Sequence, residues 1–363
     1  MPSLKETKDR IVSVNSTRKI TSAMKMVASS KLHHAQTLIS NMLPYESSLE
    51  HILKSFLAAM PDVQTPLNIP HAHVKRVALV VFTSNSSLCG GFNNNVIKMM
   101  EQTIGEYKAQ GISDIVVYPV GRKVAEKVTK LGLPAGGDFM GLADKPNPHG
   151  CQLIAEELCK KFMAGEIDKV ELIYHHFKSA GSQILQRRVF LPIDIHDDFM
   201  SDNDRDLTST MATEKAQEYL RKKQEKADNG KKVEVTKPVN DNFIVEPDLT
   251  TVLQELIPQE LNLMVYTALL DSNASEHAAR MVAMQTATDN ADELLRELNL
   301  QYNKGRQQAI TNELLDIVGV LLYSRKHNMI CCLAVDPAYR KRGIASLLLR
   351  EALDELDRDK DIT

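Results

Sequence analysis

Two long tracts without helix-breaking residues dominate this sequence. Residues 3–43 contain no Gly, no Pro and no aromatic residue, and residues 259–318 contain one Gly and no Pro. The apolar residues of the first tract recur mostly at steps of three, four or seven: Leu4, Ile11, Val14, Met24, Val27, Leu32, Ala35, Ile39 and Met42. This spacing predicts a helix with one narrow apolar stripe, on the order of 60 Å long at about 1.5 Å per residue.

The sequence also indicates where this helix starts and how far it continues. Ser3 and Glu6 have the spacing of a capping box, in which each side chain accepts a hydrogen bond from the backbone N–H of the other residue. Pro44 removes one backbone donor and should kink the helix. Apolar residues keep the helical spacing as far as Leu57, so we expect an N-terminal shaft helix over residues 1–60.

The second tract carries a similar stripe of small and apolar residues. Its members are Ala278, Met281, Val282, Ala287, Ala291, Leu294, Leu295 and Leu298. Each helix alone would leave this face poorly covered, so we expect the two to pair as a long antiparallel coiled coil, in which small side chains permit close approach. Arg18 and Lys25 lie near the seam, so the supercoil should be locally irregular. The C-terminal shaft helix should span residues 247–319.

The residues between the two helices follow a different pattern. β-Branched runs of strand length (HVKRVALVVFTS, SDIVVYPVG, KVELIYHHFKS and SQILQRRVFLPI) alternate with helical segments at 93–110, 122–131 and 149–163. This alternation predicts a central Rossmann-like domain over residues 74–195, and an α/β fold class for the chain. Residues 196–242 form a charged insertion, with RKKQEK at 221–226, and should be solvated.

The last part of the chain, residues 320–363, no longer follows the helical spacing of apolar residues seen before it. MICCLAV predicts a strand, DPAYRKRGIA a turn and SLLLREALDELDR an amphipathic helix, which together make a short C-terminal βα appendage. The turn can aim backbone N–H groups at an anion such as a pyrophosphate. The candidate residues are Arg340, Lys341, Arg342, Gly343, Ile344 and Ala345. A surface βα unit without a ligand explains the pattern equally well.

Composition argues against several classes of function. The net charge of -3 disfavours a generic nucleic-acid binder, and no apolar run approaches the roughly 18 residues of a membrane span. Five Cys without a CxxC pair suggest neither a disulfide framework nor a zinc site, and they fit a reducing compartment. No Ser/His/Asp order, HExxH motif or carboxylate pair stands out, so we expect no catalytic residue and no metal site in residues 1–319.

Two polar features admit both a structural and a functional interpretation. The loop NSSLCGGFNNN follows the first predicted strand, but it matches neither GxxxxGK nor GxGxxG, so a tight turn is favoured over a phosphate-binding loop. The histidines, including His175 and His176, lack carboxylates or thiols at ligand spacing and should be surface or packing residues. Gln307 and Thr311 lie four residues apart, with Arg280 further back on the same predicted helix. These polar residues form either a solvated helix face or a contact strip for a partner.

Three segments together carry a family resemblance. SLKETKDRIVSVNSTRKITSAMKMVASSKL, EHAARMVAMQTATDNADELL and RQQAITNELLDIV resemble the gamma subunit of F-type ATP synthases, over Ser3 to Gly319. The resemblance implies a central-stalk rotor subunit that couples transmembrane proton flow to ATP synthesis and holds no catalytic residue or cofactor of its own. It implies as partners the alpha and beta subunits, the epsilon subunit and the membrane c-ring. The protein would be peripheral, on the cytoplasmic face of the bacterial cell membrane, without inserting into it.

The resemblance also implies roles for individual residues. Those expected to contact the catalytic subunits are Lys19, Met24, Lys25, Arg280, Arg306, Gln307 and Thr311. Low, flexible side chains on the outer face of the first helix would let it turn inside a close-fitting sleeve. They are Ala23, Met24, Met26, Ala28 and Ser29. One departure stands at Asn85 and Ser86, where the family carries an Asp and a basic residue.

The appendage resembles a different family. Val335, Pro337, Arg340, Gly343 and Ala345 fit the strand and the R-x-x-G-x-A turn of the acyl-CoA-binding core of GNAT N-acetyltransferases. This resemblance implies acetyl-CoA as a ligand and an acyl-CoA-dependent N-acetyltransferase as the alternative function. A piece this short lacks the acceptor-substrate surface and buries little apolar surface. An inert tail on an intact rotor subunit is the third interpretation.

Overall fold

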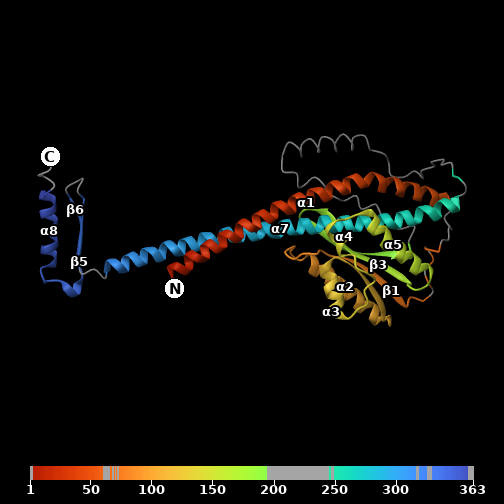
Figure 1. Cartoon of the computed structure of the whole chain (residues 1–363), viewed down its shortest axis with the longest axis horizontal. Coiled ribbons are helices and arrows are strands. Elements are labelled where there is room, and N and C mark those ends of the chain that lie inside the picture. The colour runs from red at the N-terminus through yellow and green to blue at the C-terminus, as the bar shows by residue number, and fades with distance from the viewer. Residues whose placement is uncertain are drawn as a thin grey trace. The chain divides into compact units, whose positions relative to one another are not determined.

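The computed structural model describes residues 3–59, 66–67, 69, 71, 73–193, 245–246, 249–315, 319–324 and 329–358. Its largest elements are two helices, α1 (Leu4–Ala59) and α7 (Leu249–Leu315) (Figure 1). Contacts divide the chain into two compact units, Met1–Lys19 with Asp289–Thr363, and Ile20–Thr288. This division cuts through both long helices, each of which the sequence presents as one domain. The charged insertion at 196–242 lies outside the described residues.

Both helices run through a proline. α1 continues past Pro44, and α7 begins at Leu249, before the tract free of Pro, and runs through Pro258. The predicted start of this helix at residue 247 lies close to the observed start, and Pro258 is accommodated inside the helix. Ile257 and Leu261 on either side of Pro258 are buried in the core, and such packing offsets the lost backbone hydrogen bond.

The unit Ile20–Thr288 is built around a four-stranded sheet in the order β2-β1-β3-β4. The strands are β1 (Arg76–Phe82), β2 (Asp114–Val120), β3 (Lys169–Ser179) and β4 (Ser182–Leu191). β1 pairs in parallel with β2 and with β3, whereas β3 and β4 are antiparallel. The predicted strands are confirmed, and the helices between them are α2 (Phe92–Ala109), α3 (Arg122–Leu131), α4 (Met140–Asp144) and α5 (Pro148–Met163).

Alternate residues of β1 face two different layers. Val77, Leu79 and Val81 pack with α2 and α3 in one buried cluster, while Ala78, Val80 and Phe82 pack with α5 and α7 in another. Side chains of a strand point alternately to the two faces of a sheet, so an uninterrupted apolar strand marks a sheet that is covered on both faces. The central α/β domain is therefore a three-layer arrangement in which α7 supplies part of one layer.

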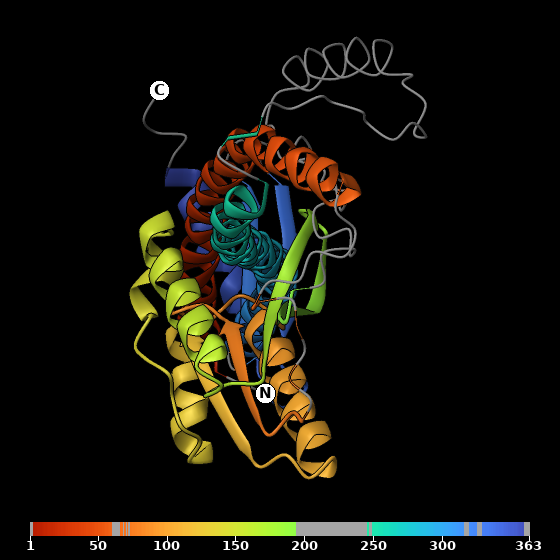
Figure 2. The same ribbon diagram turned by 90° about the vertical axis from the view of Figure 1, so that its right-hand side faces the viewer.

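α1 packs against α7, as Figure 2 shows, and Phe177 of β3 belongs to the same buried cluster. The seam between them is made by Leu32, Ala35 and Ile39 of α1 with Leu270, Ala274 and Ala278 of α7, all buried. The helices are antiparallel, because Thr21 Oγ1 lies 2.9 Å from Thr288 Oγ1 while the later seam residues of α1 pack with the earlier seam residues of α7. The predicted antiparallel pairing through small residues is confirmed in this unit.

The other unit contains the remaining parts of both helices. Arg18 Nη1 donates to Asp292 Oδ1 at 2.8 Å, and a Cβ on Gly305 would lie 3.3 Å from Leu4, so these segments are antiparallel as well. The capping box is present, with Ser3 N 2.9 Å from Glu6 Oε2 and Glu6 N 3.2 Å from Ser3 Oγ.

The appendage folds as a hairpin with one helix. β5 (Gly319–Ser324) pairs antiparallel with β6 (Met329–Val335), a short 3-10 helix spans Pro337–Tyr339, and α8 spans Ile344–Arg358. The predicted strand, turn and helix are confirmed, and β5 is an additional strand that was not predicted. Gly319 lies against Leu348 and Ile344 of α8, so the hairpin is covered by the helix at this point.

Candidate functional site

The expected contact residues on α1 differ in exposure. Lys19 is exposed, and Met24 and Lys25 are half-buried. Ala28 was expected on the outer face, but it is 1% exposed. The expectation for Ala28 is wrong, because it precedes Leu32 by one helical turn and so faces α7 with the other seam residues.

Some exposed positions of α1 carry large apolar side chains instead of small ones. Ile20, Met26 and Val27 are between 58% and 69% exposed. Exposed apolar side chains of this size suit contact with another protein surface.

A groove of about 350 Å³ lies beside α1, within the unit Ile20–Thr288. One wall belongs to α1 and is apolar except for Lys31, and the opposite wall carries charged side chains from α4 and α7 and one serine from the loop after β1. The lining residues are Ile20, Ala23, Met24, Val27, Ala28, Lys31, Ser86, Ala143, Asp144, Glu276, His277 and Arg280.

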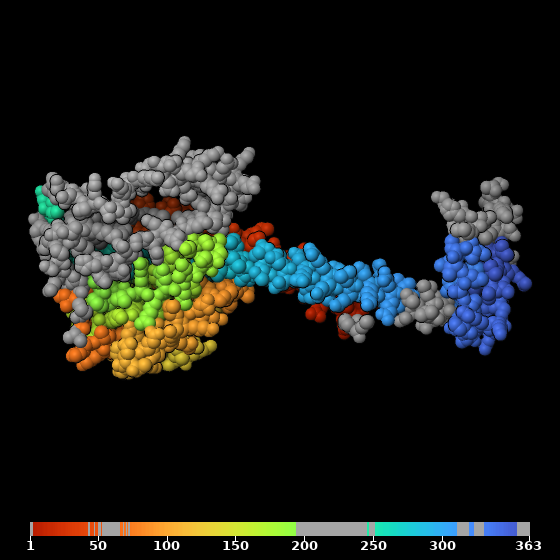
Figure 3. Space-filling view, turned by 180° about the vertical axis from the view of Figure 1, so that it is seen from behind, coloured from red at the N-terminus to blue at the C-terminus, as the bar shows by residue number. Residues whose placement is uncertain are grey.

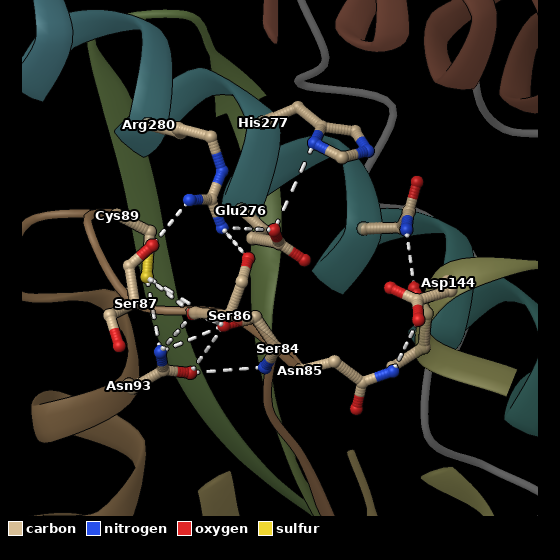
Figure 4. A network of polar contacts seen from close by, with 12 residues as sticks. Ser84, Asn85, Ser86, Ser87, Cys89, Asn93, Asp144, Glu276, His277 and Arg280 are labelled. Atoms are coloured by element: carbon tan, nitrogen blue, oxygen red, sulfur yellow. Dashed lines mark hydrogen bonds and ion pairs between the residues drawn. The ribbon is translucent and has the colours of Figure 1, made fainter. Parts of the chain in front are cut away.

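Arg280 lies at the polar wall and is bound within the chain (Figure 4). Its Nη2 donates to Glu276 Oε1 at 2.6 Å and to Ser86 Oγ at 2.7 Å, and its Nη1 donates to the carbonyl of Ser87. The side chain is 11% exposed. Arg280 therefore joins α7 to the loop after β1, which local sequence patterns could not predict because the two serines are 193 and 194 residues away.

The loop after β1 is a tight turn whose polar groups are satisfied internally. Asn93 Oδ1 accepts from the backbone N–H of Ser84 at 3.0 Å, and its Nδ2 donates to the carbonyl of Ser86 at 3.3 Å and to Cys89 Sγ at 3.1 Å. Asn85 Nδ2 donates to Asp144 Oδ2 at 2.7 Å. The two residues that depart from the family pattern, Asn85 and Ser86, thus make hydrogen bonds inside this chain. These contacts agree with the interpretation as a strand-to-helix turn.

Burial shifts two titratable groups at the groove. It raises the pKa of Glu276, which the hydrogen bond from Arg280 opposes, and it lowers the pKa of His277 to about 4. Nδ1 of His277 is buried without a hydrogen-bond partner. The groove therefore holds a neutral imidazole beside an ion pair, which is a binding surface rather than an arrangement for proton transfer.

Two other histidines have carboxylate partners that sequence spacing could not reveal. His71 Nδ1 lies 2.8 Å from Asp168 Oδ1, and His176 Nδ1 lies 2.7 Å from Asp271 Oδ2. Each pair joins elements that are more than ninety residues apart, so only the tertiary fold brings the groups together. His176 and Asp271 are buried and tie β3 to α7, which is a packing role as expected.

The expected contact residues near the end of α7 lie in the other unit. Arg306 and Gln307 are exposed, and the side chain of Thr311 lies outside the described residues. Leu300 and Ile310 on the same segment are 71% and 49% exposed. In Figure 3 the side chains of this part of α7 form an open surface along the helix.

The turn of the appendage has the backbone of a tight bend. Lys341 and Gly343 have φ of +65° and +79°. Arg340 Nε donates to the carbonyl of Val335 at 3.3 Å, and the guanidinium of Arg342 lies 5.3 Å from the ring of Tyr339. Arg340, Lys341 and Arg342 are exposed, while Ile344 and Ala345 are half-buried. These contacts stabilise the turn itself.

Neither a metal site nor a membrane span is found in the part of the chain that the structure describes. Within those residues no three His, Cys, Asp or Glu side chains come together as metal ligands would. None of the helices described combines the length and apolar character that crossing a bilayer requires.

Comparison with known proteins gives one consistent result. The family model described as ATP synthase matches residues 3–321. The chain is 52% identical to the ATP synthase gamma chain of Phocaeicola vulgatus and 51% identical to that of Bacteroides thetaiotaomicron, each alignment covering 88% of this chain and 99% of the relative. Among solved structures, the fold is similar to that of a chain in the mitochondrial ATP synthase of Euglena gracilis in rotational state 3, with a TM-score of 0.50, 18% identity, and coverage of 87% of this chain and 92% of that one.

Most of the appendage, from residue 322 onward, lies beyond the family match. Nothing in the comparisons supports an acetyltransferase. The match over residues 3–321, together with relatives that are more than half identical along nearly their whole length, shows that this chain belongs to the ATP synthase gamma chain family.

Proposed function

We propose that this protein is the central-stalk rotor subunit of a bacterial ATP synthase, where it couples transmembrane proton flow to ATP synthesis and hydrolysis. The observation that carries this proposal is the pair of antiparallel helices α1 and α7 in a chain of the gamma family. Small side chains such as Ala35 and Ala274 lie in the seam between the helices, so the helices can pack closely and the pair has a small diameter. One face of the central sheet packs against α7, so torque on the domain would be transmitted to the helices.

The mechanism requires no catalytic residue in this chain. An asymmetric shaft presents a different face to each catalytic subunit as it turns, and each nucleotide site is biased toward the state that contacts that face best. Nucleotide affinity and shaft position are then linked, and the coupling acts in both directions. The exposed apolar residues Ile20, Met26 and Val27 of α1, next to Lys19 and Lys25, offer such an asymmetric surface.

We propose that the partners are the alpha and beta subunits around the shaft, with the epsilon subunit and the membrane c-ring at the central domain. The protein would then be peripheral to the cytoplasmic face of the cell membrane. Lys19 and Lys25 would engage carboxylates of the catalytic subunits alongside Met24, and Arg306, Gln307 and Thr311 would form hydrogen bonds with them near the end of α7. The exposure of Arg306 and Gln307 supports this assignment.

The test is coupled ATP synthesis in the reconstituted complex. The double variant Arg306→Ala with Thr311→Ala should lower the synthesis rate, because it removes a charge-assisted and a neutral hydrogen bond from the rotor surface. Arg296→Ala is the matched control, since Arg296 is an exposed arginine on the same helix. An unchanged rate in the double variant would refute these contacts.

Assembly tests the role as a whole. The full chain and a chain that ends at Gly319 should both co-purify with the catalytic subunits, because the family match covers almost none of the appendage. The positive control is the gamma chain of a relative, co-purified with its own catalytic subunits. If that control assembles and both forms of this chain fail to do so, the rotor assignment is overturned.

A further inference from the structure

One strand of the appendage is more apolar than its surroundings in this chain explain. β6 has the sequence MICCLAV, without a charged residue, Pro or Gly. Such an uninterrupted apolar run is typical of a strand whose two faces are both covered. Yet Ile330, Cys331, Cys332, Leu333 and Ala334 are all exposed, and Ile330 and Leu333 keep 42% and 38% of their surface in solvent. The sequence of β6 therefore suits a strand that a further surface covers.

β6 also has an edge that is free to pair. Among the residues that the structure describes, it pairs with β5 alone, in a sheet of two strands. Alternate residues of such a strand direct N–H and C=O groups away from the partner strand, where another strand can bind them. Edge strands usually carry charged residues or Pro that prevent this pairing, and β6 has neither. A two-stranded sheet is only marginally stable, so added strands would stabilise the appendage.

The helix of the appendage covers β5 better than β6. A Cβ on Gly319 of β5 would lie 3.0 Å from Leu348 of α8, so this position faces the helix. Side chains alternate along a strand, and residues directly opposite each other share a face, so Leu321 and its partner Leu333 lie on the same face as Gly319. Leu321 is half-buried there, whereas Leu333 is exposed. The helix-facing side of β6 is thus left partly open.

A β-bulge adds a second apolar residue to this open side. Cys332 lies opposite Leu322, on the other face of the sheet, and Ile330 lies opposite the next residue of β5, so Cys331 is the extra residue of the bulge. Ile330 therefore shares the helix-facing side with Leu333, although the two are three residues apart. The strand is regular on the C-terminal side of the bulge, so its edge can still form a ladder.

A second copy of β6 fits this edge. Cys332 is the central residue of Met329–Val335, so antiparallel pairing of the whole strand with its own copy sets the two Cys332 residues opposite each other, with Cα atoms about 4.5–5.5 Å apart. The bulges then place Ile330 of each copy beside Leu333 of the other, on the side of the two α8 helices. No like charges meet along β6. A contact of β6 with β5 of another copy would continue head-to-tail from copy to copy, whereas the symmetric contact closes as a dimer.

We propose that β6 is a self-association site, through which two copies of this chain form a symmetric dimer with a four-stranded sheet in the order β5-β6-β6-β5. β6 lies beyond the family match, which ends at residue 321, so the proposal does not depend on the rotor function. The contact involves one strand and two apolar side chains per copy, which is less than the roughly 800 Å² per partner of a standard interface. The dimer should therefore be weak, with a dissociation constant on the order of 10 µM.

Sedimentation of the isolated full-length chain, from about 1 µM to about 200 µM, tests the dimer. The wild type should change from monomer to dimer across this range. Leu333→Lys should raise the dissociation constant at least about ten-fold, because it removes an apolar contact and sets like charges near the two-fold axis. Leu322→Lys is the matched control, since Leu322 is 56% exposed on the face of β5 away from α8 and takes no part in the contact. Circular dichroism should show equal helix content in all three chains.

The register is tested by disulfide formation between copies. Cys331→Ser leaves Cys332 as the exposed thiol, and diamide, which takes up the two electrons and two protons that a pair of thiols releases, should then link the two copies. Cys332→Ser leaves Cys331 instead and should form the link at least about ten-fold more slowly, because the two Cys331 residues are offset along the paired strands. A non-reducing gel reports the linked product.

Three results would overturn the proposal. They are a monomer at every concentration, an equal effect of Leu333→Lys and Leu322→Lys, and faster cross-linking through Cys331 than through Cys332. A dimer formed by a chain that ends at Gly319 would also overturn it, because that chain lacks β6. These measurements use the isolated chain, so they are separate from ATP synthesis and assembly, which test the rotor function.

Discussion

Two buried histidines should make the stability of this protein depend on pH. His175 on β3 is 4% exposed and stacks on Phe92 with ring centroids 4.5 Å apart, and His277 on α7 is 9% exposed. Burial lowers the pKa of each imidazole from 6.5 to about 4. In both residues Nδ1 is buried without a hydrogen-bond partner, so protonation inside the fold is unfavourable. The Glu276 carboxylate lies 4.0 Å from Nδ1 of His277, but it is already paired with Arg280 at 2.6 Å.

The sign and the size of the effect follow from linkage. A histidine whose pKa is lower in the folded state stabilises the fold above its unfolded pKa, and this contribution is lost as pH falls from about 6.5 toward about 4. Between pH 8 and pH 5 each histidine should remove about 2 kcal/mol from the free energy of unfolding. The pKa of Glu276 is raised by burial, so its protonation offsets part of this loss at the acidic end of the range.

The assay is urea unfolding of the full chain at pH 8, 6 and 5, followed by circular dichroism. The wild-type free energy of unfolding should fall by about 4 kcal/mol at most across this range. His175→Phe keeps the stack on Phe92 but cannot be protonated, so it should remove about half of the pH dependence. His149→Gln, at an exposed position, is the control. Equal stability at pH 8 and pH 5, or a full pH dependence in His175→Phe, would refute the reasoning.

Three further predictions concern the fold. Gly121→Ala should lower the free energy of unfolding by at least about 2 kcal/mol, because Gly121 has φ of +108° and a Cβ there would lie 2.1 Å from the carbonyl oxygen of Thr83; a urea midpoint equal to the wild type would contradict this. Glu171→Gln should lower the free energy of unfolding by about 3 kcal/mol in the same measurement, because the carboxylate is 2% exposed and accepts hydrogen bonds from Tyr, Lys and Arg side chains. Burial alone would raise the pKa of Glu171, but these hydrogen bonds hold it below its usual value. Under native conditions a maleimide should label Cys331 and Cys332 rapidly and the other three thiols slowly, as mass spectrometry of the peptides would show; fast labelling of a buried thiol would contradict the packing.

The long elements could be predicted because their signals are local and repeated. A tract without Gly or Pro and with apolar residues at helical spacing leaves few alternatives to a long helix, and β-branched runs between such helices leave few alternatives to a sheet. The capping box joins Ser3 and Glu6, which are three residues apart, and both of its hydrogen bonds were predicted correctly. β5 was missed because GVLLYS adjoins a helix and gains its strand identity only by pairing with β6.

The candidate site was predicted less completely, and the reason is distance along the chain. Arg306 and Gln307 were named through the family resemblance, and both are exposed. The orientation of Arg280 does not follow from helical spacing, because the serines that hold it are 193 and 194 residues away. Ala28 was placed on the wrong face because the sequence shows a stripe but does not say which neighbour covers it.

By itself the sequence determined the two helices, their small-residue seam, the strands of the central domain and, through resemblance, the family. These properties depend on periodicity and on residue type, which are fixed before the chain folds. Only the tertiary structure decided which side chains meet: the hydrogen bonds from Arg280 to Ser86 and Ser87, the hydrogen bond between His176 and Asp271, and the burial of His277. Such contacts depend on where remote elements cross and on how much water is excluded there, and neither quantity is encoded in any local stretch of residues.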